Sequence, residues 1–290
     1  MNDELRPRRS VLYLPGANQR ALEKAATLPA DGLILDLEDA VAPDAKADAR
    51  QAACAAAADG RFGPREVAIR ANGLDTAWFA DDVRAIVAAG PDVLLVPKVD
   101  SVEQVRTIEA AVEDAGADED LSIWAMLETP RAVLDARELV HASPRLTGLV
   151  LGTNDLAKEL HAEQVRGRAP LLTALSWCVL AAREAGLVVL DGVFNDLDDP
   201  EGLEAECRQG RELGFDGKTL IHPRQIEPCN RVFAPSDDEV AHAREVIEAF
   251  EAARAEGRGV VTVGGRMVEN LHVEQARRTL AVAEVIAARG

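Results

Sequence analysis

The sequence predicts an α/β protein whose main part is a (β/α)8 barrel, followed by a C-terminal helical extension. Eight short apolar runs, bounded by turn residues, recur along the chain as far as Leu220. Between most of them lie Ala-, Glu- and Arg-rich stretches with helical periodicity. Eight strand–helix repeats are typical of a (β/α)8 barrel. A doubly wound sheet stays open as an alternative, because periodicity counts strands without showing that they close into a ring.

The apolar runs give the expected strands, and the periodic stretches between them give the expected helices. Strands are expected at about Val11–Leu14, Leu33–Leu37, Val67–Arg70, Val93–Val96, Ile123–Leu127, Leu149–Leu151, Leu187–Leu190 and Phe215–Leu220. Helices are expected at Gln19–Thr27, Lys46–Ala58, Ala77–Ala89, Val102–Ala115, Pro130–Val140 and Leu171–Ala185.

The last part of the chain does not continue the barrel repeat. We therefore expect a catalytic barrel domain over residues 1–235 and a helical lid or exchange arm over residues 236–290, with a plain packing element as the alternative. Ser236 is a suitable N-cap for a long helix, and Gly257 is a suitable stop. The expected elements are a helix at Asp237–Glu256, a turn and strand at Gly259–Arg266 and a final helix at Val273–Ala288.

Composition and charge narrow the possible functions. The chain has 290 residues, 48% hydrophobic content and a net charge of −18, which argues against nucleic acid or an anionic membrane as a partner. No apolar run reaches membrane-spanning length and the first residues do not resemble a signal peptide, so the sequence predicts a soluble, cytoplasmic protein. The four cysteines are too scattered for a zinc clamp or a disulfide framework.

Two carboxylates are the strongest functional signal. Glu128 ends one apolar run and Asp155 closely follows another, about one strand–helix–strand repeat further along. Carboxyl ends of barrel strands form the active-site rim of this fold, so both side chains are expected to be neighbours there. Two acids, waters and a substrate oxygen are a usual ligand set for Mg²⁺. We therefore expect Glu128 and Asp155 to bind Mg²⁺.

Further charged residues follow other expected strands, among them Asp36, Glu38, Asp39, Arg70 and Lys98. A helix cap or a solvated rim position explains each of them taken alone. Together they would form a cluster rich in acids, which a bound cation would stabilise. The forked guanidinium of Arg70 can hold a carboxylate by two parallel hydrogen bonds. Arg70 and Asp39 are the candidates for catalysis on a 2-oxo or 2-hydroxy acid, with C–C bond chemistry next to a carbonyl.

Seven sequence blocks resemble the citrate lyase β-subunit family, which includes the malyl-CoA and citramalyl-CoA lyases. They follow in order from Arg9 towards the final helix. The blocks are Arg9–Gly16, Leu35–Val41, Arg70–Gly73, Pro97–Val99, Glu128–Pro130, Gly152–Leu156 and Gly217–Gln225.

The resemblance implies a Mg²⁺-dependent carbon–carbon lyase that converts a 3-hydroxy-acyl-CoA thioester into an acyl-CoA and a 2-oxo acid. A malyl-CoA-type thioesterase is the alternative within the family. The resemblance also implies that Tyr13, Arg20 and Lys24 lie near CoA, although a core-edge tyrosine and a solvated helix face are equally good interpretations. Together with the arm-like C-terminal part, it favours a homotrimer or a hexamer.

One position departs from the family pattern. Related lyases carry an Asp in a Met-(Ile/Val)-Asp motif that reaches a neighbouring subunit as acid/base, whereas this chain has Met267-Val268-Glu269. Glu269 keeps the carboxylate on a longer arm, and a misplacement of about 1 Å can cost on the order of 10²-fold in rate. A solvated Glu at a helix start is the alternative.

Two rival functions use the same barrel. A Mg²⁺-dependent aldolase for free hydroxy-oxo acids would need a His base early in the barrel, and Asp36–Val41 contains no His. A non-catalytic CoA-binding subunit would have lost the rim acids and Arg70, which this chain retains. Membership of a citrate lyase complex and a free-standing enzyme both remain open.

Overall fold

The computed structural model describes residues 6–288, and these form two compact units. The larger unit spans Arg8–Asn230, and the smaller one consists of residues 6–7 and 231–288. The division falls inside helix α10 (Ile226–Phe233), slightly before the expected boundary at 235/236.

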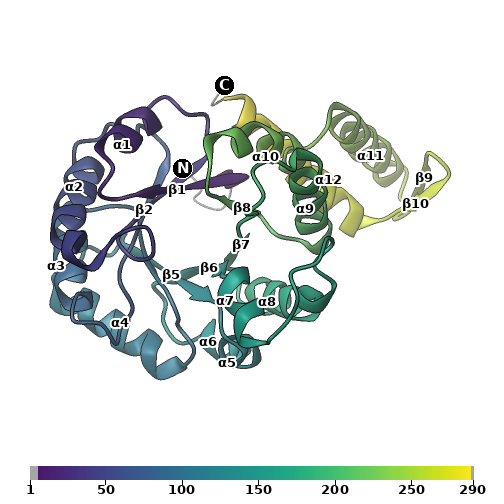
Figure 1. Cartoon of the computed structure of the whole chain (residues 1–290). Helices are drawn as coiled ribbons and strands as arrows, with labels where there is room; N and C mark the ends of the chain where they lie inside the picture. Colours follow the sequence, from purple (N-terminus) through teal and green to yellow (C-terminus); the bar gives the residue numbers. More distant parts are fainter. Residues whose placement is uncertain (1–5, 289–290) are drawn as a thin grey trace. The chain divides into compact units, whose positions relative to one another are not determined.

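The larger unit is a closed barrel of eight parallel strands, ordered β1 to β8 around the ring. Figure 1 shows the helices surrounding these strands. Val11 of β1 pairs with Thr219 of β8, and this pairing closes the sheet. The closure confirms the (β/α)8 barrel and rules out the open, doubly wound sheet. The strands are β1 Ser10–Pro15, β2 Gly32–Asp36, β3 Glu66–Arg70, β4 Val93–Val96, β5 Ser122–Leu127, β6 Leu146–Leu151, β7 Val188–Asp191 and β8 Gly217–Leu220.

Helices follow the strands, and short polar side chains fix several of their starts. Ser101, Thr129 and Asp199 cap α4, α5 and α9 by accepting a backbone N–H hydrogen bond. The barrel helices are α1 Gln19–Ala25, α2 Lys46–Ala58, α3 Phe79–Ala89, α4 Val102–Asp114, α5 Pro130–Leu134, α6 Ala136–Leu139, α7 Thr153–Glu159, α8 Leu172–Glu184 and α9 Pro200–Leu213.

Three helical features differ from expectation. The helix expected over Pro130–Val140 is divided at Asp135, whose short polar side chain is a poor residue for a helix interior. Helix α7 was not among the expected helices, because it is too short to show a periodic pattern. Helix α9 was not among them either, because Gly202 and Gly210 weaken its helical pattern.

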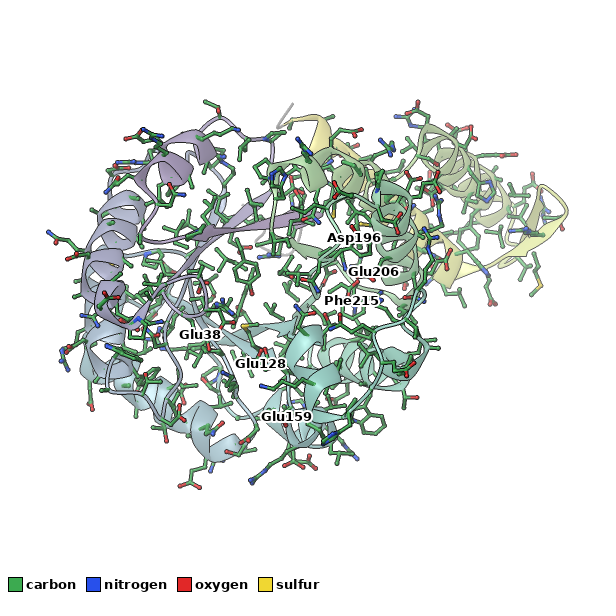
Figure 2. All side chains as sticks on the ribbon, in the orientation of Figure 1. Glu38, Glu128, Glu159, Asp196, Glu206 and Phe215 are labelled. Carbon is green, nitrogen blue, oxygen red and sulfur yellow. The ribbon has the colours of Figure 1, made fainter. Side chains whose placement is uncertain are left out.

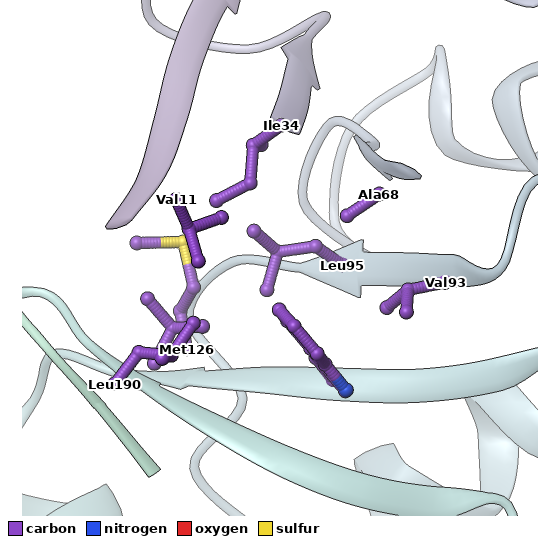
Figure 3. Close-up of a cluster of buried hydrophobic side chains, with 9 residues drawn as sticks. Val11, Ile34, Ala68, Val93, Leu95, Met126 and Leu190 are labelled. Atoms are coloured by element: carbon purple, nitrogen blue, oxygen red, sulfur yellow. The ribbon is translucent and has the colours of Figure 1, made fainter. Parts of the chain in front are cut away.

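The interior of the barrel is filled by side chains from successive strands (Figure 3). Trp124 on β5 is the largest of them and is only 1% exposed. Gly148 on the neighbouring strand makes room for it, because a Cβ there would lie 2.6 Å from the indole nitrogen. The cluster consists of Val11, Ile34, Ala68, Val93, Leu95, Trp124, Met126, Val150 and Leu190. This packed core leaves the carboxyl ends of the strands as the place for a site.

The C-terminal unit has its own small core. Ser236 caps α11 (Asp237–Ala255) and Gly257 follows it with φ +76°, so both expected helix signals are confirmed. An antiparallel hairpin, β9 (Val261–Val263) and β10 (Arg266–Val268), leads into α12 (Asn270–Ala287). The core consists of Ala243, Val246, Phe250, Val263, Val268, Val273 and Ala276. Within residues 6–288, none of the helices has both the length and the apolar character that crossing a membrane requires.

Candidate active site

A cavity of about 350 Å³ opens at the carboxyl ends of the barrel strands. Five residues expected at the site line it, namely Tyr13, Asp39, Arg70, Glu128 and Asp155. They come from β1, the loop after β2, β3, the end of β5 and the first turn of α7. We call this space the first cavity. Figure 2 labels Glu38 and Glu128 inside the ring of helices.

Glu128 is buried at the base of this cavity and is held by backbone contacts. Its Oε1 accepts a hydrogen bond of 2.7 Å from the backbone N–H of Lys98. Gly152, at the end of β6, lies so close that an added Cβ would overlap the Glu128 side chain. Burial, followed by the negative charges of Glu38 and Asp155, raises the pKa of Glu128 to about 7. The site therefore concentrates negative charge around a buried carboxylate.

This donor set fits Mg²⁺. Glu128 and Asp155 carry the hard carboxylate oxygens that Mg²⁺ prefers. The pKa of Glu128 is raised by burial and then by the like charges of Glu38 and Asp155, and a bound cation would offset these charges. Among residues 6–288, no three His, Cys, Asp or Glu side chains converge into a ready-made metal cage. A site with two protein acids leaves the remaining positions to waters and substrate oxygens, which is how proteins usually hold Mg²⁺.

Arg70 lies beside these acids, but its fork is already engaged. Nε and Nη2 donate hydrogen bonds of 2.7 Å each to the two carboxylate oxygens of Asp36. Nη1 faces Glu38 Oε2 at 2.9 Å and Asp39 Oδ2 at 3.6 Å. The two-bond grip on a substrate carboxylate expected from the sequence is therefore not free in this state, because Asp36 occupies it.

Lys98 contributes through its backbone, a role that the sequence analysis did not assign. Its φ of 55° is unusual for a residue other than glycine and is compatible with a strained turn at a functional site. This turn directs its N–H to Glu128, while its Nζ lies 3.4 Å from Glu38 Oε1. The sequence shows Pro97-Lys98 directly after an expected strand. It does not show that Lys98 adopts a positive φ, because lysine has no particular preference for that conformation.

The three expected CoA contacts do not lie together. Tyr13 points into the first cavity, where the guanidinium carbon of Arg70 lies 4.9 Å from its ring centroid. Arg20 and Lys24 are exposed on α1 and line neither of the two cavities that the structure describes. Their role in binding CoA stays a prediction.

Glu269 belongs to the C-terminal unit. It is half-buried and occupies the N-cap position of α12, where its backbone N–H donates to His272 Nδ1 at 3.2 Å. This position agrees with the alternative that Glu269 starts a helix. Its proposed acid/base role stays a prediction.

A second cavity, of about 330 Å³, adjoins the first and is lined by Arg166, Arg168 and the loop after β7. Asn154 and Asn195 line both spaces and bond to each other reciprocally, at 3.2 and 2.7 Å. This pair of amides therefore separates the two cavities.

A ring of four charges lies next to the site, with Arg168, Asp191 and Lys218 buried and Glu206 half-buried. Arg168 Nη1 donates to Asp191 at 2.6 Å, and Lys218 Nζ donates to Asp191 at 3.1 Å and to Glu206 at 2.7 Å. Arg168 Nε lies 3.5 Å from Glu206 and completes the ring. Although complete burial acts in the opposite direction, Lys218 and Arg168 together hold the pKa of Asp191 below its ordinary value. Thr219 links this ring to the first cavity, because it lines the cavity and donates to the backbone oxygen of Asp191.

Comparisons with known proteins identify the family of this barrel. Residues 9–223 match the family described as HpcH/HpaI aldolase/citrate lyase, and residues 164–287 match C–C bond lyases of the TIM-barrel fold. The chain is 49% identical to a (3S)-malyl-CoA thioesterase of Cereibacter sphaeroides (strain ATCC 17025 / ATH 2.4.3) over 290 residues, which cover 100% of this chain and 99% of that protein.

Two more distant relatives extend the comparison. Citrate lyase subunit beta of Escherichia coli (strain K12) is 39% identical over 285 residues, covering 97% of this chain and 94% of that one. The crystal structure of protein CitE from Mycobacterium tuberculosis in complex with magnesium, acetoacetate and coenzyme A superimposes with a TM-score of 0.78 at 32% identity, covering 96% and 98%. The family model covers most of the chain and these relatives match almost all of it, so the chain belongs to the HpcH/HpaI aldolase/citrate lyase family.

Proposed function

We propose that the chain is a Mg²⁺-dependent enzyme that hydrolyses a 3-hydroxy-acyl-CoA thioester of the malyl-CoA type. The observation that carries this proposal is the 49% identity along the whole chain with a (3S)-malyl-CoA thioesterase. The carbon–carbon lyase activity expected from the sequence becomes the second candidate. Its support is the match of residues 164–287 to C–C bond lyases and the similarity to citrate lyase subunit beta.

In this proposal Glu128 and Asp155 hold Mg²⁺, which would polarise a substrate oxygen and stabilise negative charge on it. The support is the buried position of Glu128, its raised pKa and the like charge of Asp155 beside it. Magnesium in the similar M. tuberculosis protein agrees with the assignment.

The substrate carboxylate is assigned to Nη1 of Arg70. Asp36 holds the other two guanidinium nitrogens, so the substrate would replace Glu38 and Asp39 at Nη1. Asp39 is 68% exposed and lines the first cavity, which suits it to accept a proton from water. Arg20 and Lys24 on α1 are assigned to the phosphates of CoA, because both are exposed cations on the first helix.

The two candidate reactions differ in the bond that breaks. In hydrolysis, water adds to the thioester carbonyl carbon, the C–S bond breaks, and the thiolate takes up a proton to give CoA and a free hydroxy acid. In lyase cleavage, the 3-hydroxyl loses its proton, the bond between carbons 2 and 3 breaks, and carbon 2 of the resulting enolate is protonated. The second route needs an acid/base, and Glu269 from a neighbouring subunit of a trimer or hexamer is the proposed group.

The test is turnover of malyl-CoA and citramalyl-CoA with and without Mg²⁺, measuring free thiol and 2-oxo acid in the same reaction. Release of thiol with hydroxy acid supports the thioesterase. Release of glyoxylate from malyl-CoA, or pyruvate from citramalyl-CoA, without free thiol supports the lyase. An enzyme that cleaves only free hydroxy-oxo acids would be an aldolase. No histidine among residues 6–288 lines the first cavity, which disfavours an aldolase with a His base.

A further inference from the structure

The hydroxyl of Tyr13 faces the first cavity with only a weak hydrogen-bond partner. That partner is the thioether sulfur of Met126, 3.8 Å from the phenol oxygen. Sulfur in a thioether is a poor acceptor, and Tyr13 has no other hydrogen bond within the described part of the chain. Even a half-buried phenol usually finds a better partner, so this hydroxyl is available to a bound molecule.

The phenol ring is held firmly although its hydroxyl has only a weak hydrogen-bond partner. One face packs against the core of the barrel, and Arg70 lies over the ring with its guanidinium carbon 4.9 Å from the centroid. Arg70 is itself fixed by the two 2.7 Å hydrogen bonds to Asp36. The phenol oxygen therefore has a set position before any substrate arrives, as electrostatic preorganisation requires.

The surroundings keep the hydroxyl protonated. Burial raises the pKa of Tyr13 well above its ordinary value, Arg70 opposes the increase, and Asp36, Glu128 and Glu38 add to it. At neutral pH the group is a neutral O–H donor. An oxygen that gains negative charge in the cavity would find the Arg70 nitrogens already shared with acids, whereas this donor is free of any strong partner.

We propose that Tyr13 is a catalytic residue whose hydroxyl donates a hydrogen bond to the thioester carbonyl oxygen as that oxygen becomes an oxyanion. This inference rests on the proposed thioester chemistry. No proton is transferred, and the bond strengthens as charge develops, so it acts on the transition state more than on substrate binding. The proposal therefore gives Tyr13 a contact with the reacting carbonyl oxygen, in place of the CoA contact that the family resemblance implied.

The chain contains one tyrosine, so tyrosine analogues modify this position alone. Fluorinated tyrosines of increasing acidity can be incorporated into the enzyme. They retain the aromatic ring at position 13 and leave every other residue unchanged, so the acidity of the phenol is the main difference along the series. At pH 7 and saturating Mg²⁺, kcat for thioester turnover should rise along the series while KM stays nearly constant. A tyrosine that only packs under Arg70 would give the same kcat throughout, and that outcome would overturn the proposal.

The Tyr13→Phe variant provides a second measurement. It removes the hydroxyl and keeps the ring beneath Arg70, so the melting temperature should stay close to that of the wild type. We expect kcat to fall by about 10²-fold, as for the loss of one oxyanion donor, with little change in KM. A fall in melting temperature with unchanged kcat would assign Tyr13 to the structure only.

A binding experiment separates failure of this inference from failure of the proposed function. If wild-type enzyme turns over none of the thioesters, the proposed function is wrong. Enzyme labelled with [4-¹³C]tyrosine gives one phenol carbon signal, which acetyl-CoA added with Mg²⁺ should shift whether or not turnover occurs. A signal that stays unchanged would count against a hydrogen bond from Tyr13 to the thioester.

Discussion

Gly152→Ala is the sharpest test of the metal site, because it moves a proposed ligand without removing it. Gly152 has φ −91°, a negative value that residues other than glycine adopt, so the effect of the substitution comes mainly from the space around its new Cβ. The new Cβ would overlap both Cβ and Oε2 of Glu128. Turning the Glu128 side chain can move Oε2 away, but its Cβ is bonded to the backbone, so the backbone around Gly152 and Glu128 must shift as well.

The size of the effect follows from the overlap. Carbon atoms rest at separations of about 3.5–4.0 Å, so the Glu128 carboxylate has to move by roughly 1 Å. A displacement of about 1 Å in a reacting site can cost on the order of 10²-fold in rate. Overpacking a buried position also destabilises a protein by about 1–3 kcal/mol. We therefore expect kcat/KM to fall by about 10²-fold, Mg²⁺ to bind at least about tenfold more weakly, and the protein to remain folded.

Calorimetric titration with Mg²⁺ and steady-state kinetics measure these two losses. Gly32→Ala is the matched control, since its added Cβ meets its nearest neighbours at 3.4 and 3.5 Å, which is ordinary contact. That control should keep wild-type Mg²⁺ affinity and kcat/KM. Wild-type affinity and rate in Gly152→Ala would show that the position of Glu128 does not matter for the metal, and the ligand assignment would be wrong.

Four further predictions concern other residues. Glu128→Gln should abolish Mg²⁺-dependent turnover while the melting temperature of the metal-free protein stays nearly unchanged; retained Mg²⁺ dependence would contradict it. Arg70→Lys should lower kcat/KM strongly despite the conserved charge, because Lys cannot hold Asp36 by two bonds, and unaltered kinetics in Arg70→Ala would remove Arg70 from the site. Lys218→Met should cost about 3–5 kcal/mol in urea unfolding, because it leaves Asp191 buried beside Glu206 with one cation fewer. Because the pKa of Asp191 is lowered in the folded wild type, its carboxylate adds to the free energy of unfolding above about pH 4, and this contribution is lost as the pH falls further. Lys218→Met removes one of the cations that lower this pKa, so its free energy of unfolding should fall less on acidification than that of the wild type. Glu269→Gln should abolish lyase turnover without unfolding the chain, and Glu269→Asp should keep or improve it; full activity in Glu269→Gln would leave Glu269 as a helix-starting residue.

The sequence predicted the barrel well because buried parallel strands leave a strong local signal. Each of the eight expected apolar runs corresponds to a strand, because a strand buried on both faces needs a continuous apolar run. Closure of the ring could not be predicted from these runs, since it depends on pairing between Val11 and Thr219, which lie at opposite ends of the barrel sequence. Short α7 was missed because it has too few residues for a periodic pattern.

The membership of the candidate site was predicted in part and its bonding was not. Strand-end positions placed Asp39, Arg70, Glu128 and Asp155 on one rim and the family resemblance added Tyr13, and all five line the first cavity, whereas Arg20, Lys24 and Glu269 do not. The sequence did not show which partner each side chain would choose, because that choice depends on side-chain geometry between different strands.

Arg70 illustrates the consequence of this limit. Its fork appeared suited to a substrate carboxylate, yet Asp36 on the adjacent strand holds it at 2.7 Å on both sides. Asp36 and Arg70 are paired residues in the β2–β3 register, so the contact comes from the barrel itself and is present before substrate binds. Arg70 then has a double task in the proposed mechanism. Its fork fixes the guanidinium over Tyr13, and its remaining nitrogen receives the substrate carboxylate, so a substitution at Arg70 should also disturb the Tyr13 hydroxyl.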